Sequence, residues 1–162
     1  MHTTTRVFRK LAMVIVAAAG CLGLSGCDGD YSVPITSSPT RKIDQRLLGN
    51  WVSRTGTEKM KVRKFDDSNY MVSYDNDLYR AYHSDIGNTS FVSAQEIDSA
   101  NRKYVYLTFK LSNDGEQLEL RGVDDKVIPK ETKSTATVQK LIKKNLQNSH
   151  LFGDEAHYVR EK

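Results

Sequence analysis

Cysteine is scarce in this sequence: Cys21 and Cys27 are the only two among 162 residues. Residues after Cys27 therefore cannot form an internal disulfide, and a domain built from them must be stabilised by packing. The sequence also lacks a glycine-rich phosphate loop and a G-x-S-x-G element. These absences argue against the motif-defined nucleotide-binding proteins and serine hydrolases.

The first residues have the organisation of an export signal. Arg6, Arg9 and Lys10 give a positive start, and residues 11–24 form an apolar run without charge. Such a run is too short to span a bilayer and is typical of a secretory signal peptide. An uncleaved signal anchor is the less favoured alternative, because glycines interrupt the run. Removing residues 1–26 lowers the formal net charge from +4 to about +1, so nucleic acid is not an expected partner.

The run ends in Leu24, Ser25, Gly26 and Cys27, which resemble the lipobox of bacterial lipoproteins. The resemblance implies cleavage before Cys27, a diacylglycerol on its thiol, palmitate as a further acyl chain, and stable anchoring of an exported protein to the cell membrane. Residues 18–21 form a second and poorer match that ends at Cys21. Asp28 resembles the signal that keeps lipoproteins of enteric-type bacteria in the inner membrane, facing the periplasm; the outer membrane is the alternative.

Residues 27–42 are rich in serine, threonine, proline and glycine, a composition that predicts a flexible tether. Tyr31, Val33 and Ile35 alternate, so docking of this segment as an edge strand is the alternative, which its two prolines disfavour. Residues 43–162 are expected to form a single domain.

Short alternating segments separated by turn residues predict an antiparallel sheet in this domain. The clearest segment lies between 102 and 112, where Val105 and Phe109 face one way while Tyr104 and Tyr106 face the other. We expect seven strands before one helix, at residues 49–53, 59–65, 69–75, 78–84, 89–95, 102–112 and 117–121, with a last strand at 156–160.

The helix is expected at about residues 134–147, because its apolar residues recur at helical spacing and Ser134 or Thr135 can cap it. The fold class is therefore mainly β (α+β): an antiparallel meander that forms a small barrel or strongly curved sheet, with one C-terminal amphipathic helix covering an end or a face.

Gly49, Asn50 and Trp51 open this meander and resemble the G-x-W start of lipocalins and lipocalin-like β-barrels. In that family the tryptophan closes the floor of the barrel and an arginine from a late strand packs over it. The resemblance implies that Arg121 has this role here.

Aromatic residues on consecutive strands are the main candidates for ligand or partner binding. Tyrosine combines apolar area with a hydroxyl group, which suits a binding surface or the lining of a cup. The alternative is the amphipathic outer face of a small sheet. The candidate residues are Trp51, Tyr70, Tyr74, Tyr82, Tyr104 and Tyr106.

Catalytic and metal sites are not indicated. The three histidines after Cys27 lack metal-ligand spacing, and no metal or cofactor is expected. His83, Ser84 and Asp85 are adjacent at a strand end, where neighbouring side chains diverge, so a hydrolase is a minor hypothesis. Paired aspartates at 66–67 and 124–125 are interpreted as turn formers.

Lys140, Lys143 and Lys144 lie on the polar face of the predicted helix. A solvated face is the simpler interpretation, and contact with anionic headgroups at the membrane surface is the alternative. We expect a membrane-anchored, non-enzymatic binding module for an apolar or amphiphilic ligand or an envelope component. The competing hypothesis is an inhibitor-like or immunity-like interaction protein with a solid core and no small-molecule ligand.

Overall fold

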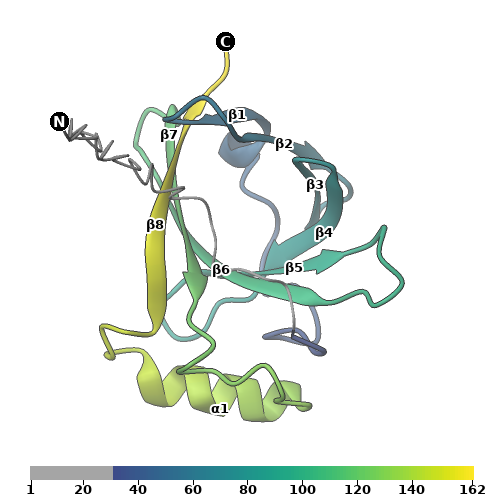
Figure 1. The fold of residues 1–162 in the computed structure, drawn as a ribbon, viewed down its shortest axis with the longest axis vertical. Helices are drawn as coiled ribbons and strands as arrows, with labels where there is room; N and C mark the ends of the chain where they lie inside the picture. Colours follow the sequence, from purple (N-terminus) through teal and green to yellow (C-terminus); the bar gives the residue numbers. More distant parts are fainter. Residues whose placement is uncertain (1–30) are drawn as a thin grey trace, which may run out of the picture.

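The structure, a computed structural model, describes residues 31–162. Eight antiparallel strands follow one another in sequence order and close into a barrel, as Figure 1 shows. A short 3-10 helix, η1 (Gln45–Leu47), precedes them, and α1 (Thr135–Asn145) lies between the last two strands. The strands are β1 (Gly49–Ser53), β2 (Lys59–Lys64), β3 (Asn69–Tyr74), β4 (Asp77–His83), β5 (Phe91–Glu96), β6 (Tyr104–Leu111), β7 (Gln117–Val123) and β8 (Phe152–Arg160).

The expected β-rich meander with a C-terminal helix is confirmed, and the barrel is closed. β8 begins at Phe152 rather than at 156, which makes it long enough to pair with both β7 and β1. Turn residues allow the tight connections: Asp75 has a φ of 50° between β3 and β4, and Gly115 has a φ of 74° between β6 and β7. Positive φ is accessible mainly to glycine and, at lower cost than for most residues, to aspartate and asparagine.

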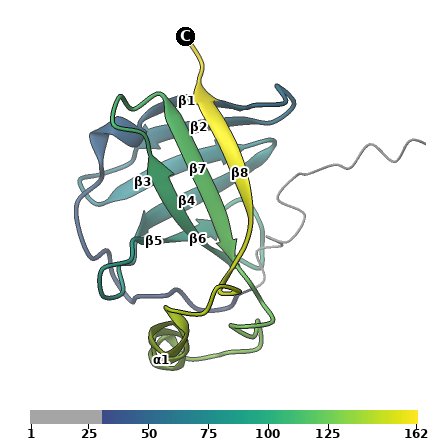
Figure 2. The ribbon, with the colours of Figure 1, turned by 90° about the vertical axis from the view of Figure 1, so that its left-hand side faces the viewer.

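Antiparallel pairing fixes which loops share an end of the barrel. The loops β2–β3, β4–β5 and β6–β7 lie at one end, which we call the closed end. The loops β1–β2, β3–β4 and β5–β6 lie at the other, which we call the open end, and the β7–β8 connection starts there before α1 packs on the outer face. Figure 2 shows η1 at the closed end, on the left, and the β1–β2 loop at the open end, on the right.

Residues 41–48 cross the closed end before they enter β1. The backbone N–H of Ile43 donates to the Asp67 carbonyl at 3.0 Å, in the β2–β3 loop. Leu47 is buried, and its carbonyl accepts from the Trp51 indole N–H at 3.0 Å. This segment therefore covers one end of the barrel interior with apolar side chains.

Residues 31–40, here called the strap, pack on the outer face of β6, β5 and β4. Tyr31 and Ile35 are buried, and the Tyr31 ring stacks on Tyr106 with 3.9 Å between ring centroids. The flexible tether predicted for 27–42 is thus wrong over residues 31–42. The alternating apolar residues find a tyrosine-bearing outer face to cover, and their burial offsets the loss of chain entropy.

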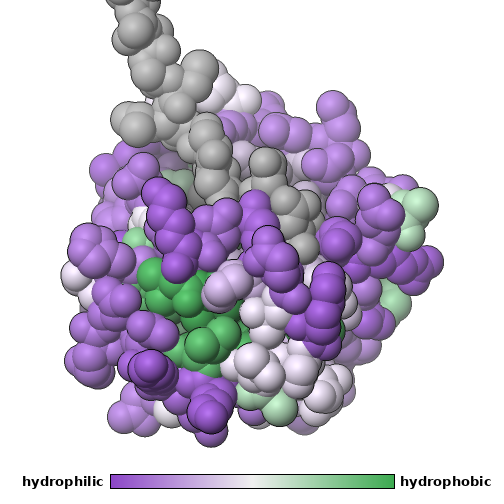
Figure 3. Space-filling model, turned by 60° about the horizontal axis from the view of Figure 1, so that its bottom comes forward, coloured by the Kyte–Doolittle hydropathy of each residue, from purple (hydrophilic) through white to green (hydrophobic). Residues whose placement is uncertain are grey.

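A second hydrophobic core lies outside the barrel, between its outer face, the strap and α1. Val138 and Ile142 of α1 are fully buried there with Phe91, and Ser134 caps the helix by accepting from the Thr137 N–H. Figure 3 brings this side of the molecule forward and shows an apolar patch within a largely hydrophilic surface. The helix therefore covers a face of the barrel rather than an end.

The lipobox and Asp28 lie outside the described residues. Within residues 31–162, no helix has the length and apolar character needed to cross a membrane.

Candidate functional site

The barrel interior is the best candidate for a binding site. The register places alternate side chains inside, so that Val72 is opposite Tyr79 and Ala94 is opposite Val105. Several of these inward-facing residues are only partly buried, although each packs against the interior core: Val72, Tyr74, Tyr79, Val92, Val105, Phe109, Leu111 and Ala156.

Partial exposure of such residues has a specific meaning in a closed barrel. Solvent reaches an inward side chain only through the interior or an end, whereas the backbone of the same residue also borders the outer surface. Eight strands enclose a space that side chains can just fill or that holds one small ligand. Val72, within β3, and Val105, the second residue of β6, are both partly exposed, which makes this interior the candidate binding space.

Several inward side chains nearer the closed end are packed. Trp51 is fully buried, and Val62 and Leu118 are nearly so. Arg160 lies over the Trp51 ring, with its guanidinium carbon 4.4 Å from the ring centroid. These residues and the crossing segment 41–48 form a floor, and Tyr74, Tyr79 and Val105 are partly exposed inward residues toward the open end.

The lipocalin resemblance implied that Arg121 packs over Trp51. This prediction is wrong, because the arginine over Trp51 is Arg160. Arg121 pairs with Thr108 on the outward face and lies over Phe152, with 5.4 Å between its guanidinium carbon and the ring centroid. Strand alternation is the reason: Leu118 and Leu120 are buried inside, and the intervening odd positions point outward.

A buried polar cluster lies in the wall next to the floor. The Nε2 of His83 is 2.7 Å from the Tyr70 hydroxyl, and its Nδ1 is 3.2 Å from an Arg41 guanidinium nitrogen. Arginine can only donate, so Nδ1 accepts, and the neutral ring carries its proton on Nε2 and donates it to Tyr70. The backbone N–H of Asp44 also donates to the Tyr70 hydroxyl, at 2.6 Å.

Burial controls the protonation of this cluster. It lowers the pKa of His83 to about 4, with a further contribution from the Arg41 charge, and raises the pKa of Tyr70 to about 12. Both groups are neutral at neutral pH. Arg41 is balanced by Asp85, with 3.2 Å between Nε and Oδ2. The cluster thus joins segment 41–48 to β3 and β4 without a net buried charge.

His83, Ser84 and Asp85 do not converge. The His83 ring points inward to Tyr70, whereas the Ser84 hydroxyl bonds Thr36 and Ser93 on the outer face, at 2.8 and 2.9 Å. A nucleophile and its base must lie within hydrogen-bond reach, and this pair does not. Among the described residues, no group of three or more histidine, cysteine, aspartate or glutamate side chains is arranged to hold a metal ion.

The six predicted aromatic binding residues divide between two sides of the barrel wall. Trp51, Tyr70 and Tyr74 point inward, whereas Tyr82 and Tyr106 point outward and are buried beneath the strap. Tyr104 is outward and partly exposed, and it exchanges backbone hydrogen bonds with Tyr31. The structure therefore does not bring them together into one surface.

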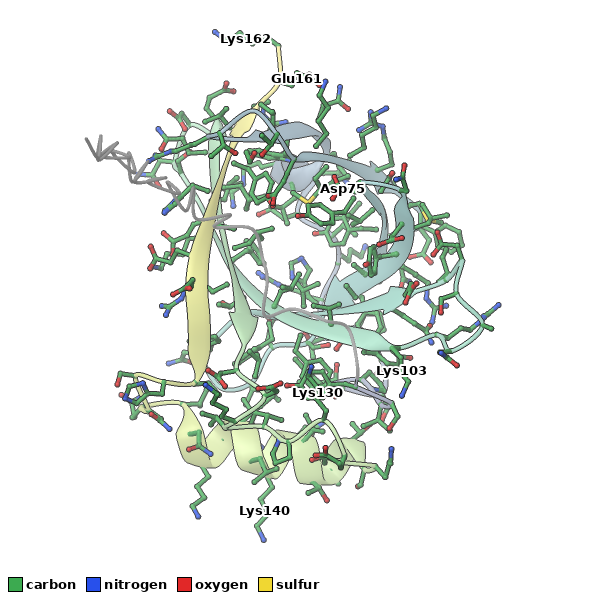
Figure 4. All side chains as sticks on the ribbon, viewed as in Figure 1. Asp75, Lys103, Lys130, Lys140, Glu161 and Lys162 are labelled. Atoms are coloured by element: carbon green, nitrogen blue, oxygen red, sulfur yellow. The ribbon has the colours of Figure 1, made fainter. Side chains whose placement is uncertain are left out.

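Sequence reasoning did not identify Val72, Tyr79 or Val92 as site residues, and it did not connect Arg41 with His83. The period of two in β3 and β6 is a signal that could have found the inward apolar residues. Lys140, Lys143 and Lys144 are exposed on α1, and Lys140 points away from the barrel in Figure 4.

No protein-family model matches the chain, and neither the curated proteins nor the solved structures contain a match to it.

Proposed function

We propose that this protein is a bacterial envelope lipoprotein whose barrel binds an apolar or amphiphilic ligand without catalysing a reaction. Acylation of Cys27 anchors it, and Asp28 retains it in the inner membrane, facing the periplasm. The observation that carries the binding role is the partial exposure of inward-facing apolar residues in a closed eight-stranded barrel.

The chemistry of the wall favours a ligand with both apolar and polar parts. Val72, Val105 and Phe109 offer aliphatic and aromatic contact area. Near the β1–β2 loop, the Tyr158 hydroxyl donates to the Glu58 carboxylate at 3.1 Å, and Glu96 occupies an inward position at the end of β5. A mainly apolar wall with a few polar groups is typical of a small-molecule site.

The competing hypothesis, an interaction protein without a small-molecule ligand, predicts a solid interior. The partial exposure of Val72 and Val105 supports the binding hypothesis over this one. The resemblance to lipocalin-like barrels adds support, because Arg160 packs over Trp51 in the arrangement that the resemblance implies.

Photolabelling tests the proposed ligand class. Membranes from cells that produce the full chain would be incubated with a diazirine-bearing fatty acid, irradiated, and digested for mass spectrometry. We expect the label on peptides that contain Val72, Val105 and Phe109, and competition by unlabelled fatty acid.

Val105→Trp should fill the interior and reduce this labelling at least several-fold. Lys110→Trp is the matched control, because Lys110 is on the same strand with its side chain exposed outside the barrel. Labelling confined to outward residues, or equal labelling of both variants, would contradict the proposal.

A further inference from the structure

The strap fixes where the chain leaves the barrel toward Cys27. Tyr31 pairs with Tyr104, the first residue of β6, through two backbone hydrogen bonds of 3.2 and 2.8 Å. The start of β6 borders the β5–β6 loop and therefore belongs to the open end. From there the strap runs toward the closed end, where Thr40 donates to the His83 carbonyl at 2.9 Å.

The attachment of Tyr31 is tight. Its side chain is 4 % exposed, its ring stacks on Tyr106, and its hydroxyl donates to the Ile128 carbonyl at 3.0 Å. The stack and the three hydrogen bonds hold this residue on the outer face of β6. Tyr31 is therefore a fixed point of the barrel rather than part of a free linker.

The remaining distance to the anchor is short. Three residues separate Tyr31 from Cys27 in the sequence, and each of the four residue-to-residue steps spans at most about 3.5 Å, so the reach is about 14 Å. This is less than the diameter of a small domain, which is about 30 Å. A barrel tied so closely at one end cannot turn its closed end toward the bilayer without releasing Tyr31.

We infer that the open end of the barrel faces the membrane that holds Cys27, and that the ligand is a lipid taken up from that same bilayer. The inference rests on the proposed acylation and the proposed binding role. Arg102 and Lys103, next to Tyr104 in the β5–β6 loop, place two cations at the chain's exit point. The same rim carries Asp75, Asp77 and Asp98, so the inference rests on the short reach from Tyr31 rather than on charge.

Inward residues near this end suit an entering acyl chain. Tyr74, Tyr79 and Val105 lie at or near strand ends that border the β3–β4 and β5–β6 loops, and all three are partly exposed. Figure 4 looks along the barrel from this side and shows Asp75, in the β3–β4 loop, and Lys103 on opposite parts of the rim. Two other surfaces compete with the open end for contact with the membrane. They are the closed end, where Phe65 is 56 % exposed, and the lysine-bearing face of α1.

The test uses the full chain in its native membrane with a photoreactive benzoylphenylalanine at one position per variant. Ala100 and Thr55 are exposed in open-end loops, Phe65 lies at the closed end, and Lys140 lies on α1. After irradiation, cross-links to phospholipid would be quantified by mass spectrometry. We expect Ala100 and Thr55 to give at least fivefold more lipid adduct than Phe65 or Lys140.

A second variant changes only the reach, by inserting twenty glycine and serine residues between Asp28 and Tyr31. We expect the difference between the four positions to disappear, and labelling of the interior by a bilayer-resident diazirine phospholipid to fall several-fold. Greater cross-linking from Phe65 or Lys140 in the chain of natural length would overturn the inference, as would uptake unaffected by the insertion.

Two readouts separate this inference from the proposed function. Incorporation of labelled palmitate reports acylation of Cys27, and fatty-acid labelling of the interior reports binding. If both are positive but cross-linking shows no preference for the open end, the inference is wrong and the proposed function stands. If palmitate is not incorporated, the proposed anchor itself is wrong.

Discussion

The Arg160 guanidinium carbon lies 4.4 Å from the centroid of the Trp51 ring, at the point where the last strand pairs with the first. The same guanidinium group donates to the carbonyls of Leu48 and Gly115, at 2.8 and 3.0 Å, and to that of Arg46 at 2.6 Å. One side chain therefore ties segment 41–48, the β6–β7 loop and β8 together over the floor of the barrel.

Replacing Arg160 with methionine should destabilise the fold by about 3 kcal/mol. The variant loses several charge-assisted hydrogen bonds and a cation–π contact, and it leaves partly buried carbonyls without this donor. Urea unfolding at neutral pH measures the change. Arg121→Met is the matched control and should cost about 1 kcal/mol, because Arg121 bonds two carbonyls at a partly exposed outer position. Equal losses in the two variants would contradict this role of Arg160.

Replacing Tyr31 with alanine should release the strap from the outer face of β6. The change removes the stack on Tyr106 and the hydrogen bond to Ile128, and loss of a buried aromatic side chain costs about 3 kcal/mol. Limited proteolysis should then cut within residues 31–40 many times faster than in the unaltered chain. Tyr79→Ala, on the partly exposed inner wall, should leave strap cleavage unchanged; equally fast cleavage there would show that the effect is not local.

Stability should depend on pH through His83. Its pKa is about 4 in the fold, below its ordinary value of 6.5, so the folded state binds fewer protons than the unfolded chain. Neutral His83 therefore makes its full contribution to the free energy of unfolding above pH 6.5. This contribution is lost as the pH falls toward 4, and the total loss is on the order of 3 kcal/mol. Urea unfolding between pH 7.5 and pH 4 measures this dependence. In His83→Gln, the free energy of unfolding should vary less steeply with pH between 6.5 and 4. An unchanged slope would show that other groups cause the pH dependence.

Replacing Cys27 with serine should abolish incorporation of labelled palmitate and block processing of the leader, since the acylated thiol is lost. Gel mobility and palmitate labelling of the full chain measure both effects. Cys21→Ser is the control, because the lipobox ending at Cys27 is the better match. Loss of labelling in Cys21→Ser with retention in Cys27→Ser would move the anchor to the earlier cysteine.

Local patterns predicted the strands well because each half-buried strand carries a period of two. The alternation of Val105 and Phe109 against Tyr104 and Tyr106 predicted which residues face the core, and the structure places them so. Turn-forming residues, such as Asp75 and Gly115, likewise predicted the loops between strands, and both residues have a positive φ in the structure. Barrel closure was left open, because it depends on pairing between the first and last strands, which no local pattern encodes.

The strap and the aromatic residues show what local patterns miss. A composition rich in serine and proline predicted flexibility for residues 31–42, yet Tyr31 and Ile35 are buried because a complementary outer face is available. Tyr70 and Tyr82 were grouped by residue type although strand alternation puts them on opposite sides of the wall. The partnership of Arg41 with His83 is a long-range contact between segments of unrelated sequence, so it could not be predicted.

The seam between β1 and β8 has a consequence for the order of folding. Trp51, Val52 and Ser53 pair with Arg160, Val159 and Tyr158, residues from the opposite end of the described chain. Such a non-local contact forms late and slows folding. The barrel therefore cannot close until residues 158–160 of β8 have been synthesised.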